Sequence, residues 1–222
     1  MLEKISAGIR ENFEAKDSVR EEGLKNSREI VRKCRIATFA LHNQDFEKAN
    51  REIKTAEEAL ERLKALFEGH ADIYYAGFVE HAQQEYSEVS VLRSLLRGNK
   101  GLENIPSPDE LRVEYAAYLN GLGDVIGELR RHVLDLIRKE SFEKAEEFLG
   151  VMESIHAILI DFDYPDAITR GLRRKTDVSR ALIEKTRGDV VNAISYKKLK
   201  TEMSNLESKL ISDSALQHKA NK

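Results

Sequence analysis

Helix-compatible sequence runs almost without interruption through this chain, and only three prolines occur in its 222 residues. Proline breaks a helix because its ring removes a backbone donor and clashes with the preceding turn. Apolar residues recur at helical spacing through the long segments, and no alternating pattern of useful length indicates a strand. The sequence therefore predicts an all-α fold made of long helices joined by short turns.

Seven helices are expected from this spacing and from the residues that typically begin and end helices. The expected spans are 2–43, 46–68, 73–97, 107–140 and 141–160, then a sixth helix that ends near Arg187 and a seventh from Gly188 to Leu210. The loop at 98–108 is not a domain boundary, because the helices on both sides carry paired acids. We expect one domain over residues 1–210 and a flexible tail over 211–222.

Composition limits the classes of partner and compartment. The formal net charge is −3, so any nucleic-acid binding must use a local basic face. Cys34 is the single cysteine, which excludes an intrachain disulfide and a cysteine metal site and suits a reducing compartment. No apolar run approaches the length of a membrane span, and the charged N-terminus does not resemble a signal peptide. We expect a soluble, cytoplasmic protein without a membrane partner.

Two pairs of acids stand out in the helical pattern. Glu85 and Glu88 are three residues apart in one expected helix, and Asp124 and Glu128 are four apart in the next. Either spacing puts both carboxylates on one face of a helix. If the two helices faced each other, the pairs would offer several oxygen ligands to a hard divalent cation.

Each pair also has an ordinary structural interpretation. Glu85 and Glu88 fall on the apolar side of their helix, where a carboxylate must be paired, protonated or metal-bound, so a buried salt bridge is an equal alternative. Asp124 and Glu128 fall opposite an apolar stripe and, taken alone, indicate a solvated face. That stripe comprises Tyr115, Leu119, Leu122, Ile126, Leu129 and Val133.

Glycines inside the expected fourth helix are the unusual feature beside these acids. Gly121, Gly123 and Gly127 each cost about 1 kcal/mol relative to alanine in a helix interior. Small residues at such positions allow another helix or a ligand to approach closely. They are therefore compatible with a site at this face.

Other motifs are weaker. A basic stripe on the expected first helix, Lys25, Arg28, Arg32 and Arg35, is more often a solvated face than a phosphate track. No phosphate-binding loop or HExxH zinc motif is present. A ferritin-like metal bundle would need Glu-x-x-His pairs on facing helices, and Glu153–His156 is the single example.

Four segments resemble the translin family, and its Trax (translin-associated factor X) branch more than translin itself. They are DSVREEGLKNSREIVRKCRIATFALH (17–42), QEYSEVS (84–90), YLNGLGDVIGELRR (118–131) and RRKTDVSRALIE (173–184). The resemblance implies a seven-helix bundle of the translin type that assembles into a hollow homo-oligomer, expected to be an octamer. One departure is Ala117-Tyr118-Leu119, where the family usually has Asp-Tyr-Leu. Without a long nuclear-targeting extension, we expect a prokaryotic, archaeal member.

The resemblance also implies a function. Trax-like proteins use a QEYxE motif and a D-x-x-x-E motif as acids of a metal-dependent RNA endonuclease. The implied catalytic and metal-binding residues are Glu85, Glu88, Asp124 and Glu128, with Mg²⁺ or Mn²⁺ as cofactor. The expected substrate is single-stranded or short duplex RNA, cut inside the oligomer.

Arg20 matches a family position associated with RNA contact, and Arg28, Arg32 and Arg35 are expected to extend that surface. The alternative is a non-catalytic RNA- or DNA-binding shell like translin, which lacks the acids. The sequence leaves open the RNA substrate, the cut position and the exact number of subunits.

Overall fold

The computed structural model describes residues 1–74, 77–98 and 102–220, and within these ranges the chain forms helices and no strand. The all-α prediction is therefore confirmed. The long helices are α1 (Leu2–His42), α2 (Phe46–Leu66), α4 (Phe78–Arg97), α6 (Tyr115–Arg138), α7 (Phe142–Ile160) and α9 (Leu172–Ala220). The short elements are α3 (Ala71–Tyr74), the 3-10 helix η1 (Leu102–Asn104), α5 (Pro108–Leu111) and α8 (Asp166–Thr169).

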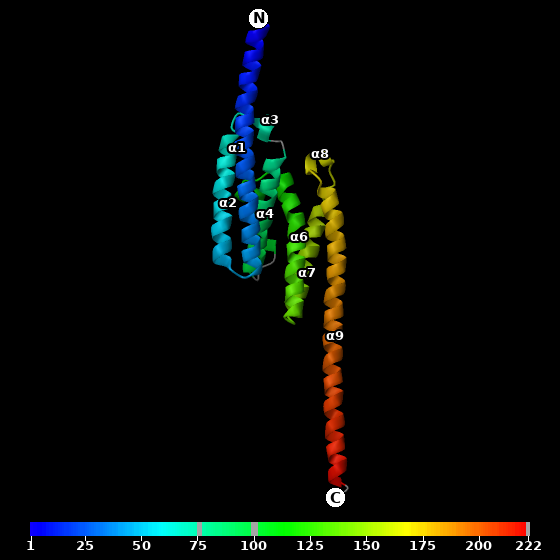
Figure 1. The fold of residues 1–222 in the computed structure, drawn as a ribbon. Helices are drawn as coiled ribbons and strands as arrows, with labels where there is room; N and C mark the ends of the chain where they lie inside the picture. The colour runs from blue at the N-terminus through cyan, green and yellow to red at the C-terminus, as the bar shows by residue number, and fades with distance from the viewer. Residues whose placement is uncertain (75–76, 99–101, 221–222) are drawn as a thin grey trace.

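The long helices form a bundle that is extended at both ends (Figure 1). Helix α1 packs against α2 and α4, whereas α6 packs against α4, α7 and α9. The N-terminal part of α1 and the C-terminal part of α9 run past the other helices in opposite directions (Figure 1). Helix α6 is therefore the central element that joins the α1–α2–α4 side to the α7–α9 side.

The central position of α6 buries more of its surface than its apolar stripe predicts. Leu122, Ile126, Leu129 and Val133 of that stripe are buried. Tyr115, which was assigned to the stripe, is instead 65% exposed. On the other side of the helix, which carries Asp124 and Glu128, three further residues are buried, because α4 and α9 both cover this helix. They are Ala117, Asn120 and Gly121.

Two of the predicted spans are divided in the structure. The third begins at Phe78 rather than near residue 73, since Gly77 adopts a φ of 93° and interrupts the helix after α3. The fourth divides into α5 and α6. A capping box between Ser107 and Glu110 starts α5, and Arg112 ends it after one turn with a left-handed φ of 52°.

The expected sixth and seventh helices are one continuous helix, α9, so the predicted boundary at Gly188 is wrong. Contacts with α6 hold the helix straight through this point. Arg130 Nη2 donates to Asp189 Oδ2 at 2.8 Å, and Val190 is 1% exposed. These contacts offset the roughly 1 kcal/mol helix penalty of one glycine. Helix α9 also continues through residues 211–220, where we expected a tail.

No helix in the described ranges is both long enough and apolar enough to cross a membrane.

A candidate acidic site and basic groove

Helices α4 and α6 approach each other closely at Gly121. A Cβ atom added there would lie 2.8 Å from the backbone oxygen of Gln84 and 2.9 Å from Ser87 Cβ. It would also lie 3.2 Å from the backbone nitrogen of Glu88. No side chain fits in this space, so glycine sets the distance between the two acid-bearing helices. The close approach expected of these glycines occurs at Gly121.

The structure brings the four predicted acids within electrostatic reach of one another. Burial raises the pKa of Glu88 to about 8, and three neighbouring carboxylates add to the rise. In decreasing order of effect these neighbours are Asp124, Glu85 and Glu128. Like charges and desolvation both disfavour the ionised form. The two acid pairs are therefore close enough to interact electrostatically, which the spacing within each helix did not by itself require.

Glu85 lies beside two cationic side chains, His81 and Arg35. Burial raises the pKa of its carboxyl, while nearby His81 and Arg35 oppose the rise. His81 Nε2 lies 3.7 Å from Glu85 Oε1, with the Glu85 side chain 19% exposed. In the described part of the chain, no cationic group pairs directly with Glu88. The buried salt bridge considered for this pair is therefore not formed by Glu88.

Asp124 is held from two sides. The side-chain amide of Gln84 donates to Asp124 Oδ2 at 2.6 Å, and the ammonium of Lys175, from α9, forms an ion pair with Asp124 Oδ1. Gly123 makes room for the lysine, because a Cβ added there would lie 3.2 Å from both Cβ and Cδ of Lys175. Helices α4, α6 and α9 thus meet at one carboxylate.

Glu128 is paired with the end of α1. His42 Nε2 lies 2.5 Å from Glu128 Oε2, and this hydrogen bond lowers the pKa of Glu128. The His42 side chain is only 3% exposed, and its Nδ1 is buried without a hydrogen-bond partner. An ordered interaction of this kind fixes the carboxylate on the α1 side of the cluster.

The solvated-face interpretation of Asp124 and Glu128 is wrong. Their side chains are 33% and 28% exposed, and both carboxylates accept hydrogen bonds from other helices. The interpretation fails because it assumes that α6 has one buried side, whereas neighbouring helices cover it on opposite sides.

A groove on the surface of α1 leads toward the acids. Its volume is about 600 Å³, and its lining combines the exposed side chains of Arg28, Arg32, Arg35 and His81 with the side chains of Leu24, Ser27, Val31, Ile36 and Phe78. Arg35 and His81 are also two of the three cationic neighbours that act on Glu85, and the third is Lys175. Arg20 lies outside this groove, exposed, with its Nη1 2.7 Å from Glu21 Oε1. Three of the four predicted RNA-contacting residues therefore share one surface.

Carboxylate oxygens are the donors that Mg²⁺ and Mn²⁺ prefer, so the chemistry of the four acids fits a hard divalent cation. The arrangement of these acids in the structure, however, is not yet that of a metal site. Among the residues that the structure describes, no three His, Cys, Asp or Glu side chains converge as a metal site would require. Asp124 and Glu128 are held by Lys175 and His42, and these bonds would have to be exchanged for metal ligation.

Three residues that contact these acids were not predicted from the sequence: His42, Gln84 and Lys175. These residues contact acids that are 86, 40 and 51 positions away along the chain, so no local spacing could have revealed them. All three nevertheless fall inside the segments that carry the family resemblance, at 17–42, 84–90 and 173–184. The polar residues of those segments were therefore the sequence signal that could have identified these three contacts.

Comparison with known proteins places this all-α bundle in a defined class. The model of the translin family matches residues 18–194, and the chain belongs to the translin family. It is 36% identical over 193 residues to an uncharacterized protein of Methanocaldococcus jannaschii, covering 86% of this chain and 84% of that protein. It is 24% identical over 180 residues to the translin-associated protein X homolog of Schizosaccharomyces pombe, covering 76% and 78%.

Solved structures agree with this assignment. The AfC3PO–duplex RNA complex contains a chain with a TM-score of 0.77 and 34% identity, covering 86% of this chain and 96% of that one. A chain of apo-NeC3PO has a TM-score of 0.75 over 84% of this chain and 96% of its own. Its identity is 21%, so this second likeness concerns the fold alone.

Proposed function

We propose that this protein is a metal-dependent endoribonuclease that cleaves single-stranded or short duplex RNA inside a hollow homo-oligomer. The observation that carries the proposal is the four-acid cluster beside an arginine-lined groove. The similarity to the protein in the AfC3PO–duplex RNA complex supports RNA as the ligand. Acidic residues alone would repel a phosphate backbone, so the adjoining basic surface is an essential part of the argument.

Glu85, Glu88, Asp124 and Glu128 would hold Mg²⁺ or Mn²⁺, which when bound polarises a phosphoryl oxygen and lowers the pKa of a water ligand. The surrounding side chains position these acids. Gln84 and Lys175 orient the Asp124 carboxylate, and His42 orients Glu128. With its pKa near 8, Glu88 holds a proton at neutral pH in the metal-free protein.

The three groove arginines are proposed to bind the phosphates of the RNA strand and direct it toward Glu85. Arg20 is proposed to contact RNA farther along α1. Arg32→Ala should weaken RNA binding and reduce the slope of log affinity against log salt by about one, because one phosphate contact is lost. The measurement is a salt titration of binding in the absence of divalent cation. An unchanged slope in Arg28, Arg32, Arg35 and Arg20 alanine variants would move the binding surface elsewhere.

Enclosure of the site requires assembly of several copies. The closed homo-oligomer, expected to be an octamer, is proposed from the family resemblance and from the long helices with exposed apolar side chains. A monomeric mass in light scattering at micromolar concentration would eliminate cleavage inside an enclosure.

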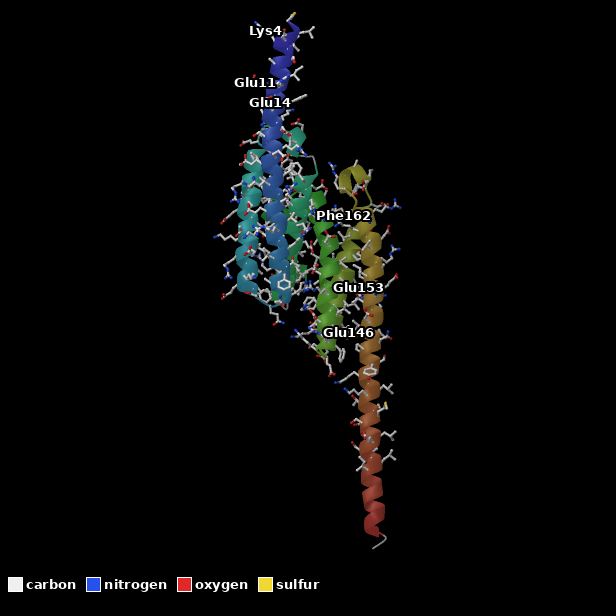
Figure 2. The ribbon with its side chains drawn as sticks, in the orientation of Figure 1. Lys4, Glu11, Glu14, Glu146, Glu153 and Phe162 are labelled. Atoms are coloured by element: carbon white, nitrogen blue, oxygen red, sulfur yellow. The ribbon has the colours of Figure 1, made fainter. Side chains whose placement is uncertain are left out.

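The decisive experiment compares RNA cleavage in four amide variants: Glu85→Gln, Glu88→Gln, Asp124→Asn and Glu128→Gln. Each should lose cleavage by roughly 100-fold or more, because a missing ligand misplaces the reacting groups, while the mass of the particle is unchanged. Glu146→Gln is the matched control, since Glu146 is an exposed acid on α7 (Figure 2), a helix that carries none of the four acids. Chelation of the divalent cation should also stop the reaction.

Retained cleavage in Asp124→Asn would overturn the assigned site. The non-catalytic shell makes a different forecast, in which the unaltered protein binds RNA but leaves it intact at every Mg²⁺ and Mn²⁺ concentration tested. That outcome would show that the protein binds RNA without cleaving it. The groove would then remain the proposed binding surface.

A further inference from the structure

The last part of α9 leaves the body of the molecule. Among the described residues, the last ion pair between this helix and the bundle joins Lys197 to Glu140, next to the end of α6. From Lys198 to Ile211 every side chain is exposed, and the helix continues well past the other helices (Figure 1). This segment also lies outside residues 18–194, which match the translin family.

Large apolar side chains form a stripe along this extension. They are spaced alternately three and four residues apart and are each at least 58% exposed: Tyr196, Leu199, Met203, Leu206 and Leu210. The residues that separate them over 197–209 are all polar or charged. An apolar seam with this spacing on an otherwise polar helix is the pattern that pairs two helices in a coiled coil.

The charges beside the seam select an orientation. Lys200 and Glu207 border it on one side, and Glu202 and Lys209 border it on the other. In an antiparallel pair with Met203 opposite Leu206 of a second copy, residues from the same side of the seam face each other. Lys200 then lies beside the second copy's Glu207, and Glu202 lies beside the second copy's Lys209. A parallel pair would instead put Glu202 beside a second Glu207.

We propose that residues 196–210 of two copies of this chain pair as an antiparallel coiled coil. The partner is a second copy because one sequence supplies both members of each complementary charge pair. The seam is only about two heptads long, and short helix pairs are weakly stable. Pairing would therefore add a contact between copies without being required for folding of the bundle. It is independent of the nuclease proposal.

Covalent trapping in the full-length chain tests the register. In Leu199→Cys/Leu210→Cys, gentle oxidation should give dimers that dissociate on reduction, with residue 199 linked to residue 210 of the other copy. The two positions on one helix are roughly 16 Å apart, too far to bridge within a chain. Native Cys34 can stay, because it is 1% exposed.

The matched control is Thr201→Cys/Ser208→Cys. In the proposed register residue 201 has the same axial level as residue 208 of the second copy, but both point away from the seam. This variant should not form a specific dimer. Dimer yields that equal the control would overturn the proposal, and so would links joining 199 to 199 and 210 to 210, which indicate parallel helices.

Charge reversal supplies a second test in the same cysteine background. Lys200→Glu should weaken the pairing roughly 2- to 30-fold, because two symmetry-related ion pairs are lost. Adding Glu207→Lys to that chain should restore the dimer yield, and failure to restore it would contradict the antiparallel pairing. Cleavage of RNA by each variant under reducing conditions separates the two proposals, since either can fail while the other holds.

Discussion

The two acid pairs of the site are held in opposite ways. On α6, Asp124 has the ammonium of Lys175 and Glu128 has the imidazole of His42. On α4, Glu88 is buried among carboxylates, and its pKa rises to about 8. The comparison shows that the acids of α6 are already paired with side chains from other helices, whereas α4 carries an acid whose charge the fold disfavours. A divalent cation would stabilise the charge of Glu88. It would compete with Lys175 for Asp124 and with His42 for Glu128.

Glu88→Gln should have the largest effect on stability. Because the pKa of Glu88 is raised above its ordinary value of 4.5, the folded protein takes up a proton, and stability falls as pH rises from about 4.5 to about 8. The variant removes this penalty, so it should be more stable than the unaltered protein by a few kcal/mol near pH 8, with little difference at acidic pH. Thermal unfolding across this range without divalent cations measures the effect.

Glu85→Gln is the matched comparison for that experiment, since burial raises its pKa in the same direction while His81 and Arg35 oppose the rise. It should show the same sign of change with smaller size. A Glu88→Gln variant that unfolds more easily at pH 8 would contradict the assigned environment.

Gly121→Ala should separate the two helices and thereby disturb both pairs. The added methyl would meet backbone atoms of α4, and overpacking of this kind costs about 1–3 kcal/mol. Alanine returns up to about 1 kcal/mol of helix propensity, so a net loss of about 1–2 kcal/mol is expected. RNA cleavage should fall with it, because Glu88 moves relative to Asp124.

Gly127→Ala in the same helix is the control for that variant. A Cβ there meets nothing within 4 Å, so the substitution should stabilise the protein by up to about 1 kcal/mol. Equal effects of the two substitutions would show that the close contact at Gly121 does not control the helix spacing.

Lys175→Met should have the smallest effect and gives the most direct test of the comparison. It leaves Asp124 without its cation, like Glu88, and should lower stability by about 1 kcal/mol in the absence of divalent ions, since the pair is partly exposed. Mg²⁺ or Mn²⁺ should then raise the melting temperature more than in the unaltered protein, because no ammonium competes for the carboxylate. An equal response to the ions in both proteins would mean that Lys175 and the cation do not share Asp124.

Sequence periodicity predicted the fold class and most of the long helices because these depend on local spacing. It failed where tertiary packing decides the outcome. Gly188 stays helical because Arg130 and the buried Val190 anchor the residues that follow it. Arg112 interrupts a predicted helix with a left-handed turn that no apolar pattern encodes.

The site shows the same division. The four acids could be selected from motifs and family resemblance, and the structure brings them within electrostatic range of Glu88, although no three of the described side chains converge as a metal site would require. The positions of Lys175 and His42 at these acids could not be deduced, because each comes from a helix distant in sequence. The incorrect solvated-face interpretation of Asp124 has the same cause, since periodicity describes one helix and carries no information about how many neighbours surround it.

The continuity of α9 through Gly188 gives this helix a mechanical role. Lys175 and the apolar stripe at 196–210 belong to one uninterrupted helix, so a residue of the acidic site and the exposed extension are parts of the same rigid element. A joint at Gly188 would have let the extension swing without affecting the site. In the continuous helix, the direction of the extension is instead fixed by the bundle contacts of the same helix that carries Lys175, among them the Arg130–Asp189 and Arg187–Glu153 ion pairs.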